Sequence, residues 1–182
     1  DVFPLIPGQY TFDLLLKNTV SKEFTSFTSD LTVPQNQSIP QLSSLILGFR
    51  AEKSAQKSKD IVPFKIGDTQ IICQSQKTFT QNDPLFVFFQ LHSLNEELRS
   101  EGELRFTIYK EDQGFFSHTK KITEYPSDTD FIEKFILEEF PPGYYSIKVS
   151  VLDREGKEFL YEAENFEITF VPDVPRPLII SK

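Results

Sequence analysis

The stretch Phe140-Pro-Pro-Gly-Tyr-Tyr-Ser-Ile-Lys-Val-Ser-Val151 decides the fold. Its Pro-Gly pair predicts a turn, because proline presets φ and glycine tolerates positive φ. After the turn, apolar and polar residues alternate, as they do in a strand with one buried and one solvated face. A second turn at residues 153–156 leads into Phe166-Glu-Ile-Thr-Phe170. The stretch therefore predicts a β-hairpin that begins at a tight corner.

The same pattern occurs near the start of the chain, in Leu5-Ile-Pro-Gly-Gln-Tyr-Thr-Phe-Asp-Leu-Leu-Leu16. Gly8 corresponds to Gly143 and Tyr10 to Tyr145, and the alternating apolar positions that follow keep the same constant offset. The register continues without a gap into the second strand of each hairpin. We interpret this match as an internal repeat.

Gly8, Tyr10, Gly143 and Tyr145 are predicted to form a structural corner at the start of each hairpin. In immunoglobulin-type sandwiches, a tyrosine at this place donates its hydroxyl to nearby backbone and ties the corner down. The alternative is a tyrosine that only packs against its neighbours.

The repeat predicts the domain organisation. Residues 1–36 are expected to be the C-terminal hairpin of a truncated β-sandwich domain, and residues 37–172 a complete immunoglobulin-like β-sandwich domain. Residues 173–182 are expected to be a proline-rich C-terminal extension. The chain contains no methionine, and we interpret it as a piece of a larger protein. A lone two-stranded hairpin is marginally stable in water, so the first hairpin is expected to pack on the complete domain, on another chain or on a separate fragment that carries the missing strands.

Short apolar runs between turn signals predict the strands of the complete domain. Residues 85–91 are mostly apolar and are expected to form a central strand that is covered on both sides. Residues 103–110 alternate, and residues 115–123 are predicted to return as their partner. Residues 131–137 suit a short helix or a strand, and we favour the strand because a corner follows. No long helical periodicity occurs, so the sequence predicts an all-β fold.

Composition restricts the partners. The net charge is −8, and an acidic surface repels phosphate backbones and anionic lipid, which disfavours nucleic acid and membrane surfaces. No apolar run is long enough to span a bilayer, so membrane insertion is not expected. The single cysteine, Cys73, has no partner for an internal disulfide.

Three motifs carry a resemblance to a known class of proteins. They are Leu-Ser-Ser-Leu at 42–45, Pro-Leu-Phe-Val-Phe-Phe at 84–89 and Pro-Pro-Gly-Tyr-Tyr at 141–145. Together they resemble the tandem immunoglobulin-like or fibronectin-like sandwiches of secreted and periplasmic bacterial proteins, including those found beside the GWxTD domain. The Gly-Trp-x-Thr-Asp signature itself is absent, because the chain has no tryptophan. The resemblance implies an extracytoplasmic location more than a mechanism, because the function of such families is mostly uncharacterised.

No catalytic constellation is recognisable. His92 and His118 lie in unrelated surroundings without metal-ligand spacing, and Cys73 is interpreted as a buried structural residue rather than as half of a Cys–His pair. Asp128-Thr-Asp130 lacks the other residues of a calcium-binding loop. We therefore interpret these two carboxylates as solvent-exposed charges of a loop. We expect no catalytic residue, no metal and no cofactor.

Gly114-Phe-Phe116 places two aromatic residues at a predicted hairpin tip. Exposed rings anchor protein partners or stack on sugars, so Phe115 and Phe116 are the candidate partner-binding residues. The alternative is that one or both rings fold back into the core.

These observations favour a non-catalytic structural and protein-interaction module of a larger extracytoplasmic bacterial protein, with a protein partner or self-association. A second hypothesis is a carbohydrate-binding accessory module of a secreted enzyme, although the lack of tryptophan weakens it. A third is the non-catalytic portion of a longer protease or hydrolase.

Overall fold

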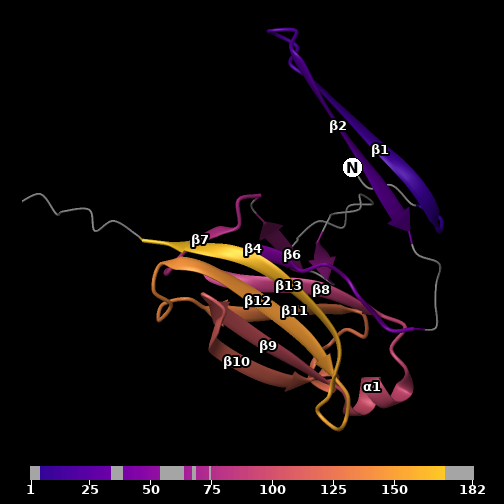
Figure 1. Cartoon of the computed structure of the whole chain (residues 1–182), viewed down its shortest axis with the longest axis vertical. Helices are drawn as coiled ribbons and strands as arrows, with labels where there is room; N and C mark the ends of the chain where they lie inside the picture. Colours follow the sequence, from indigo (N-terminus) through magenta and orange to yellow (C-terminus); the bar gives the residue numbers. More distant parts are fainter. Residues whose placement is uncertain (1–4, 34–38, 54–63, 67–68, 74, 171–182) are drawn as a thin grey trace, which may run out of the picture. The chain divides into compact units, whose positions relative to one another are not determined.

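A computed structural model describes residues 5–33, 39–53, 64–66, 69–73 and 75–170. The chain divides into two compact units, residues 1–39 and 40–182, and each is described by itself (Figure 1). The expected extension at 173–182 and the expected boundary at residue 36 lie outside the described residues.

The first unit is a β-hairpin. Its strands, β1 (Gly8–Lys17) and β2 (Phe24–Val33), pair antiparallel from Gly8 opposite Val33 to Lys17 opposite Phe24. In the connecting turn, the side-chain oxygen of Asn18 accepts a hydrogen bond from the backbone N–H of Val20 at 2.9 Å. Asparagine favours such turns because its short side chain mimics a backbone carbonyl.

The second unit is a β-sandwich of two sheets. In one sheet the strand order is β10-β9-β12-β13-β7, and Figure 1 shows β10, β9, β12 and β13 side by side in one layer. All neighbours are antiparallel except β13 and β7, which pair in parallel. The bounds are β7 (Thr78–Thr80), β9 (Glu103–Lys110), β10 (Gln113–Lys121), β12 (Gly143–Leu152) and β13 (Glu158–Thr169).

The other sheet has the order β11-β8-β4-β6-β5, with β3 also paired to β8. The predicted central position of this strand is confirmed, because β8 pairs with β11 along one edge and with β4 along the other. Its inward face is buried, whereas Phe86 and Gln90 on the outer face are only partly buried. The bounds are β3 (Gln41–Leu42), β4 (Ile46–Lys53), β5 (Lys65–Ile66), β6 (Thr69–Cys73), β8 (Pro84–His92) and β11 (Asp130–Ile136).

The core lies between these two sheets and is rich in aromatic rings. Phe89 of β8 is fully buried and stacks on Phe131 of β11, with ring centroids 5.3 Å apart. Phe106 of β9 reaches Phe89 from the opposite sheet, at 6.1 Å between centroids. The inward residues of β12 complete the core: Tyr145, Ile147, Val149 and Val151.

Most of the expected strands are present. The expected strand over 131–137 is confirmed as β11, and 115–123 returns as β10, which ends before a short 3₁₀ turn (Ile122–Glu124). The helix α1 (Glu96–Glu101) was not expected. The side chain of Asn95 caps it by accepting a hydrogen bond from the backbone N–H of Leu98. Figure 1 shows this helix at one end of the sandwich. Ser150 was expected on the solvated face but is buried, with its hydroxyl donating to Glu158.

The last hairpin, β12–β13, has the same register as the first. Gly143 lies opposite Ile168 and Tyr145 opposite Phe166, just as Gly8 lies opposite Val33 and Tyr10 opposite Leu31 in β1–β2. The turns also correspond. Asp153 follows β12 and accepts a hydrogen bond from the N–H of Glu155, and Asn18 follows β1 and accepts one from the N–H of Val20, at 2.9 Å in each case. The second hairpin differs by a bulge between Val151 and Leu152.

Each hairpin begins at a corner closed by a tyrosine. The Tyr145 hydroxyl donates to the carbonyl of Pro141 at 2.5 Å, and the Tyr10 hydroxyl donates to the carbonyl of Ile6 at 2.8 Å. Tyr145 is buried, and this burial raises the pKa of its hydroxyl. Gly143 has a backbone φ of 148°, which residues with a Cβ atom rarely adopt.

We expect Tyr145→Phe to lower the free energy of unfolding of the second unit by about 1–3 kcal/mol, because the Pro141 carbonyl loses its donor inside the corner. Tyr10→Phe is the matched control, since it removes the equivalent bond from an exposed position. Urea denaturation of both variants measures the difference. Equal stability of Tyr145→Phe and the native chain would contradict a structural role for this bond.

Candidate binding surfaces

The first hairpin exposes an apolar face. The register places Tyr10, Phe12, Leu14 and Leu16 of β1 on one face. Leu14 is 40% exposed, whereas Val149, its counterpart in the second hairpin, is fully buried. The same contrast holds for Phe12 and Leu16. The exposed large side chains of the face are Phe12, Leu14, Leu16, Phe27 and Leu31.

The opposite face of the hairpin is polar in its middle. Thr11 donates to Asp30 at 3.3 Å, and Thr28 donates to Asp13 at 2.7 Å, so these side chains satisfy one another across the two strands. Cross-strand pairs of this kind stabilise a solvated sheet surface. The hairpin is therefore amphipathic, and only its apolar face resembles the inner surface of a sandwich.

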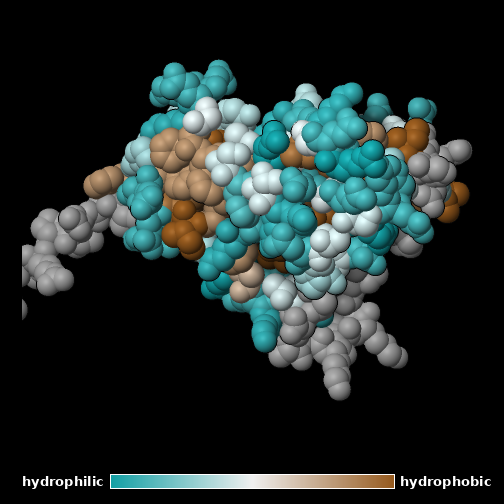
Figure 2. Space-filling view, turned by 90° about the horizontal axis from the view of Figure 1, so that it is seen from below, coloured by the Kyte–Doolittle hydropathy of each residue, from teal (hydrophilic) through white to brown (hydrophobic). Residues whose placement is uncertain are grey.

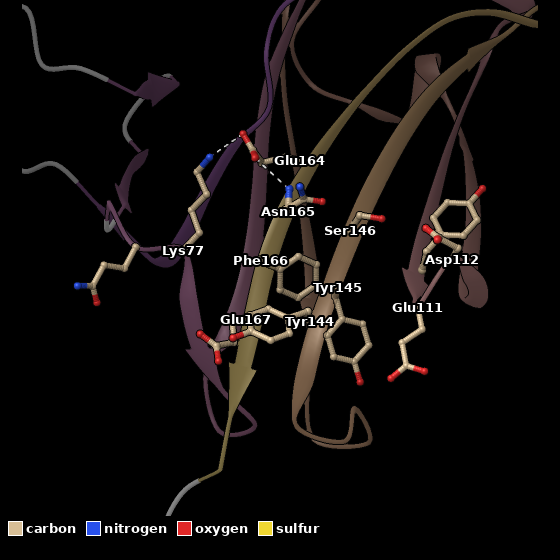
Figure 3. Close-up of a pocket in the computed structure, with 12 residues that line it drawn as sticks. Lys77, Glu111, Asp112, Tyr144, Tyr145, Ser146, Glu164, Asn165, Phe166 and Glu167 are labelled. Atoms are coloured by element: carbon tan, nitrogen blue, oxygen red, sulfur yellow. Dashed lines mark hydrogen bonds and ion pairs between the residues drawn. The ribbon is translucent and has the colours of Figure 1, made fainter.

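The second unit has an open groove of about 590 Å³ on the outer surface of the β9-β12-β13 layer (Figure 3). The register aligns Tyr109, Ser146 and Asn165 in one row across the three strands. Tyr144, which is 75% exposed, lies opposite Glu167 in the neighbouring row. Two tyrosine rings, a hydroxyl and an amide therefore line the same groove.

Carboxylates dominate the charge of the groove. Glu111 and Asp112 come from the β9–β10 turn, where both adopt positive φ, and Glu167 comes from β13. Lys77 forms an ion pair with Glu164 at 2.7 Å, drawn as a dashed line in Figure 3. The groove presents acceptors and aromatic faces, which suit hydroxyl-rich or cationic ligands better than anions.

Phe115 and Phe116, the candidate partner-binding residues, lie on the edge strand β10 and are partly exposed. The Phe115 ring packs on Phe140, with centroids 4.9 Å apart, and the Phe116 ring packs on Phe135 at 5.9 Å. On the face drawn in Figure 2, apolar side chains gather toward the end of the sandwich where β10 begins. Both rings therefore combine contact with the core and exposure to solvent.

The residues considered for catalysis are dispersed. Cys73 lies on β6 and is partly buried, which raises the pKa of its thiol, whereas His92 ends β8, and β4 separates these two strands. His118 lies on β10, where its ring stacks on Phe106. Asp128 pairs with Arg99 at 3.1 Å. Within the described ranges, no three His, Cys, Asp or Glu side chains form a group that could hold a metal ion.

A small polar network lies on β12 and β13, outside the groove. Lys148 donates to Glu158 at 3.0 Å, and Ser150 donates to the same carboxylate at 2.7 Å. The Lys148 ammonium also lies 4.1 Å from the centroid of the Tyr161 ring. The hydrogen bond from Lys148, followed by that from Ser150, lowers the pKa of Glu158.

This network predicts a pH dependence. Because the folded-state pKa of Glu158 is lowered, its contribution to stability is present above the ordinary value of 4.5 and is lost as the pH falls below it. We expect Glu158→Gln to lose less unfolding free energy than the native chain between about pH 6 and pH 3. Urea titrations across this pH range measure how the free energy of unfolding of each chain depends on pH. An identical dependence for Glu158→Gln and the native chain would contradict the stabilising role of the Glu158 carboxylate.

No protein-family model matches the chain, and no curated protein shows significant similarity to it. Among the described residues, no helix is long and apolar enough to cross a membrane.

Sequence reasoning missed the groove. Tyr144 occupies a position that alternation assigns to the solvated face. An exposed tyrosine beside a corner was therefore the one feature of the sequence that could have indicated the groove. Tyr109 and Asn165 join it only because β9 and β13 both pair with β12 in a particular register.

Proposed function

We propose that the chain is a non-catalytic structural and protein-interaction module, built from tandem immunoglobulin-like sandwiches, in a larger extracytoplasmic bacterial protein. One observation carries the proposal. The hairpins β1–β2 and β12–β13 share their register and their tyrosine corner, yet the apolar face is buried in one and exposed in the other. Two copies of a closing hairpin indicate two units of one type, and an exposed apolar face favours association.

The strand order supports the immunoglobulin-like assignment. In that fold the B and E strands pair in one sheet, while C, F and G are neighbours in the other. Here β8 pairs with β11, and β9, β12 and β13 are neighbours in the opposite sheet. The tyrosine corner at the start of β12 occupies the place of the one at the start of strand F.

A second candidate function is carbohydrate binding, and the groove is the observation that favours it. Tyrosine rings stack on the apolar faces of sugars, and carboxylate and amide groups exchange hydrogen bonds with hydroxyls. Tyr109 and Tyr144 would supply the rings, and Asn165 and Glu167 the polar contacts.

A polysaccharide array separates the two functions. Under the leading proposal, the intact chain gives a blank array. Suppose instead that the native chain binds a glycan, that Tyr144→Ala abolishes this binding and that Tyr161→Ala retains it. The leading proposal would then be replaced by the carbohydrate-binding function. Tyr161 is a matched control, because it is an exposed tyrosine of the same sheet that does not line the groove.

A capture experiment tests the protein partner directly. The immobilised intact chain is compared with the double variant Phe115→Ser/Phe116→Ser in crosslinking against extracytoplasmic proteins of the producing cells. We expect a defined protein on the native chain that the variant retains less well. Equal retention would remove Phe115 and Phe116 from the proposed interface.

A further inference from the structure

The groove on the outer surface of the β9-β12-β13 layer carries carboxylates on both sides of an exposed aromatic residue. Glu111 and Asp112, in the turn that follows β9, are exposed, and Glu167 on β13 is partly buried. Because β9 and β13 are the two neighbours of β12, these carboxylates flank the strand that carries Tyr144 (Figure 3). Neighbouring strands are about 4.8 Å apart, so one side chain placed over β12 is within reach of carboxylates from either side.

These carboxylates are not neutralised by the chain itself. Among the residues that the structure describes, Glu111, Asp112 and Glu167 form no ion pair. Lys77 is the one basic residue among the described residues that line the groove, and its ammonium is paired with Glu164 at 2.7 Å. A ligand that balances the charge of the groove therefore has to supply its own cation.

The same layer shows how such a cation is held. The Lys148 ammonium lies 2.8 Å from the Glu158 carboxylate and 4.1 Å from the centroid of the Tyr161 ring. An ion pair and a cation–π contact thus act on one ammonium group. Tyr144 and Glu167 lie opposite each other on β12 and β13 and offer the same two groups. In the described part of the chain, no lysine or arginine lies over the Tyr144 ring.

The groove is larger than one cationic side chain needs. Its volume is about 590 Å³, and it is open along the surface of the sheet. The row formed by Tyr109, Ser146 and Asn165 lies beside Tyr144 and Glu167 and offers hydroxyl and amide groups to the backbone of an extended segment. The combination fits a peptide that carries a basic side chain.

We propose that this groove binds a basic segment of a protein partner, with an arginine or lysine side chain over Tyr144, between Glu167 and the turn at Glu111 and Asp112. The inference rests on the proposed function, because it takes the chain as a protein-interaction module. It adds a surface that Phe115 and Phe116 do not line, and it names the chemistry that this surface recognises.

The test uses the intact chain and a fluorescent synthetic peptide, Gly-Ser-Arg-Ser-Arg-Ser-Gly, with a matched peptide in which glutamine replaces both arginines. Fluorescence anisotropy at low ionic strength measures the binding of each peptide. The double variant Glu111→Gln/Asp112→Asn removes two carboxylates of the groove. Its matched control is Glu138→Gln/Glu139→Gln, because these two residues are also adjacent and exposed but do not line the groove.

We expect saturable binding of the arginine peptide that Glu111→Gln/Asp112→Asn weakens by about fivefold or more, since two exposed ion pairs are lost. Glu138→Gln/Glu139→Gln changes the net charge equally and should alter the affinity by less than about twofold. Tyr144→Ala should weaken binding by about threefold or more, whereas Tyr144→Phe keeps the aromatic face and should preserve it. Circular dichroism of each chain variant controls for folding.

Three outcomes would overturn the inference. They are the absence of saturable binding to the native chain, equal binding of the glutamine peptide, and equal weakening by the two double carboxylate variants, which would indicate attraction to the overall negative charge. A Tyr144-dependent signal on the polysaccharide array without peptide binding would assign the groove to sugars.

The failure of this inference is distinguishable from the failure of the proposed function. If the peptide does not bind but Phe115→Ser/Phe116→Ser still reduces the capture of a defined protein, the inference is rejected and the proposed function stands. A Tyr144-dependent array signal that Tyr161→Ala retains would reject the proposed function whatever the peptide does.

Discussion

Val149→Asp is expected to abolish cooperative folding of the second unit, whereas Leu14→Asp, at the equivalent position of the first hairpin, should leave that unit as stable as in the native chain. Val149 is fully buried and lies opposite Phe106 on one side and Glu162 on the other. A carboxylate there has no cationic partner opposite it, and the neighbouring glutamate adds repulsion.

The expected size follows from the cost of an unpaired buried charge. Such a charge destabilises by about 3–5 kcal/mol, and the lost packing of valine adds to it. A domain of this size has a total stability of about 5–15 kcal/mol. Far-UV circular dichroism and urea denaturation measure both variants. A cooperative transition of Val149→Asp at the native midpoint would show that β12 does not face the core.

Phe89→Ala is expected to lower the free energy of unfolding of the second unit by about 3–5 kcal/mol, because it leaves a cavity between the two sheets. The ring joins β8 to β11 through Phe131 and to the opposite sheet through Phe106.

The matched control is Phe159→Ala, because Phe159 lies on β13 and is about half exposed. It should cost less than about 1 kcal/mol, since little buried contact is removed. Chemical denaturation of both variants gives the comparison. Similar losses for the two phenylalanines would contradict the assignment of Phe89 to the centre of the core.

Alternation and turn signals predicted most of the strands, because the inward residues have apolar side chains and each corner has proline and glycine. The helix α1 escaped prediction because its six residues bury only Leu98, which is too short a pattern for helical periodicity. Ser150 was misassigned because alternation describes which way a side chain points. It does not describe the contact with Glu158, whose carboxylate accepts a hydrogen bond from the Ser150 hydroxyl.

The exposed face of the first hairpin could be predicted, because the repeat alone assigns its apolar positions. The groove could not be, since Tyr109, Ser146 and Asn165 meet only through the pairing register of three strands. Hydrophobic alternation specifies a face of a strand, but it does not specify which residues of neighbouring strands lie in one row.

Hydrogen exchange of the intact chain tests most directly whether the apolar face of β1–β2 is exposed while the equivalent face of β12–β13 is buried. Amides of β12–β13 should exchange only with global unfolding, because their face is part of the core. Amides of β1–β2 should exchange at least about 100-fold faster, because a two-stranded hairpin is marginally stable without packing. Equal protection of the two hairpins in the monomeric chain would mean that the apolar face of β1–β2 is covered, and would contradict its exposure in the structure.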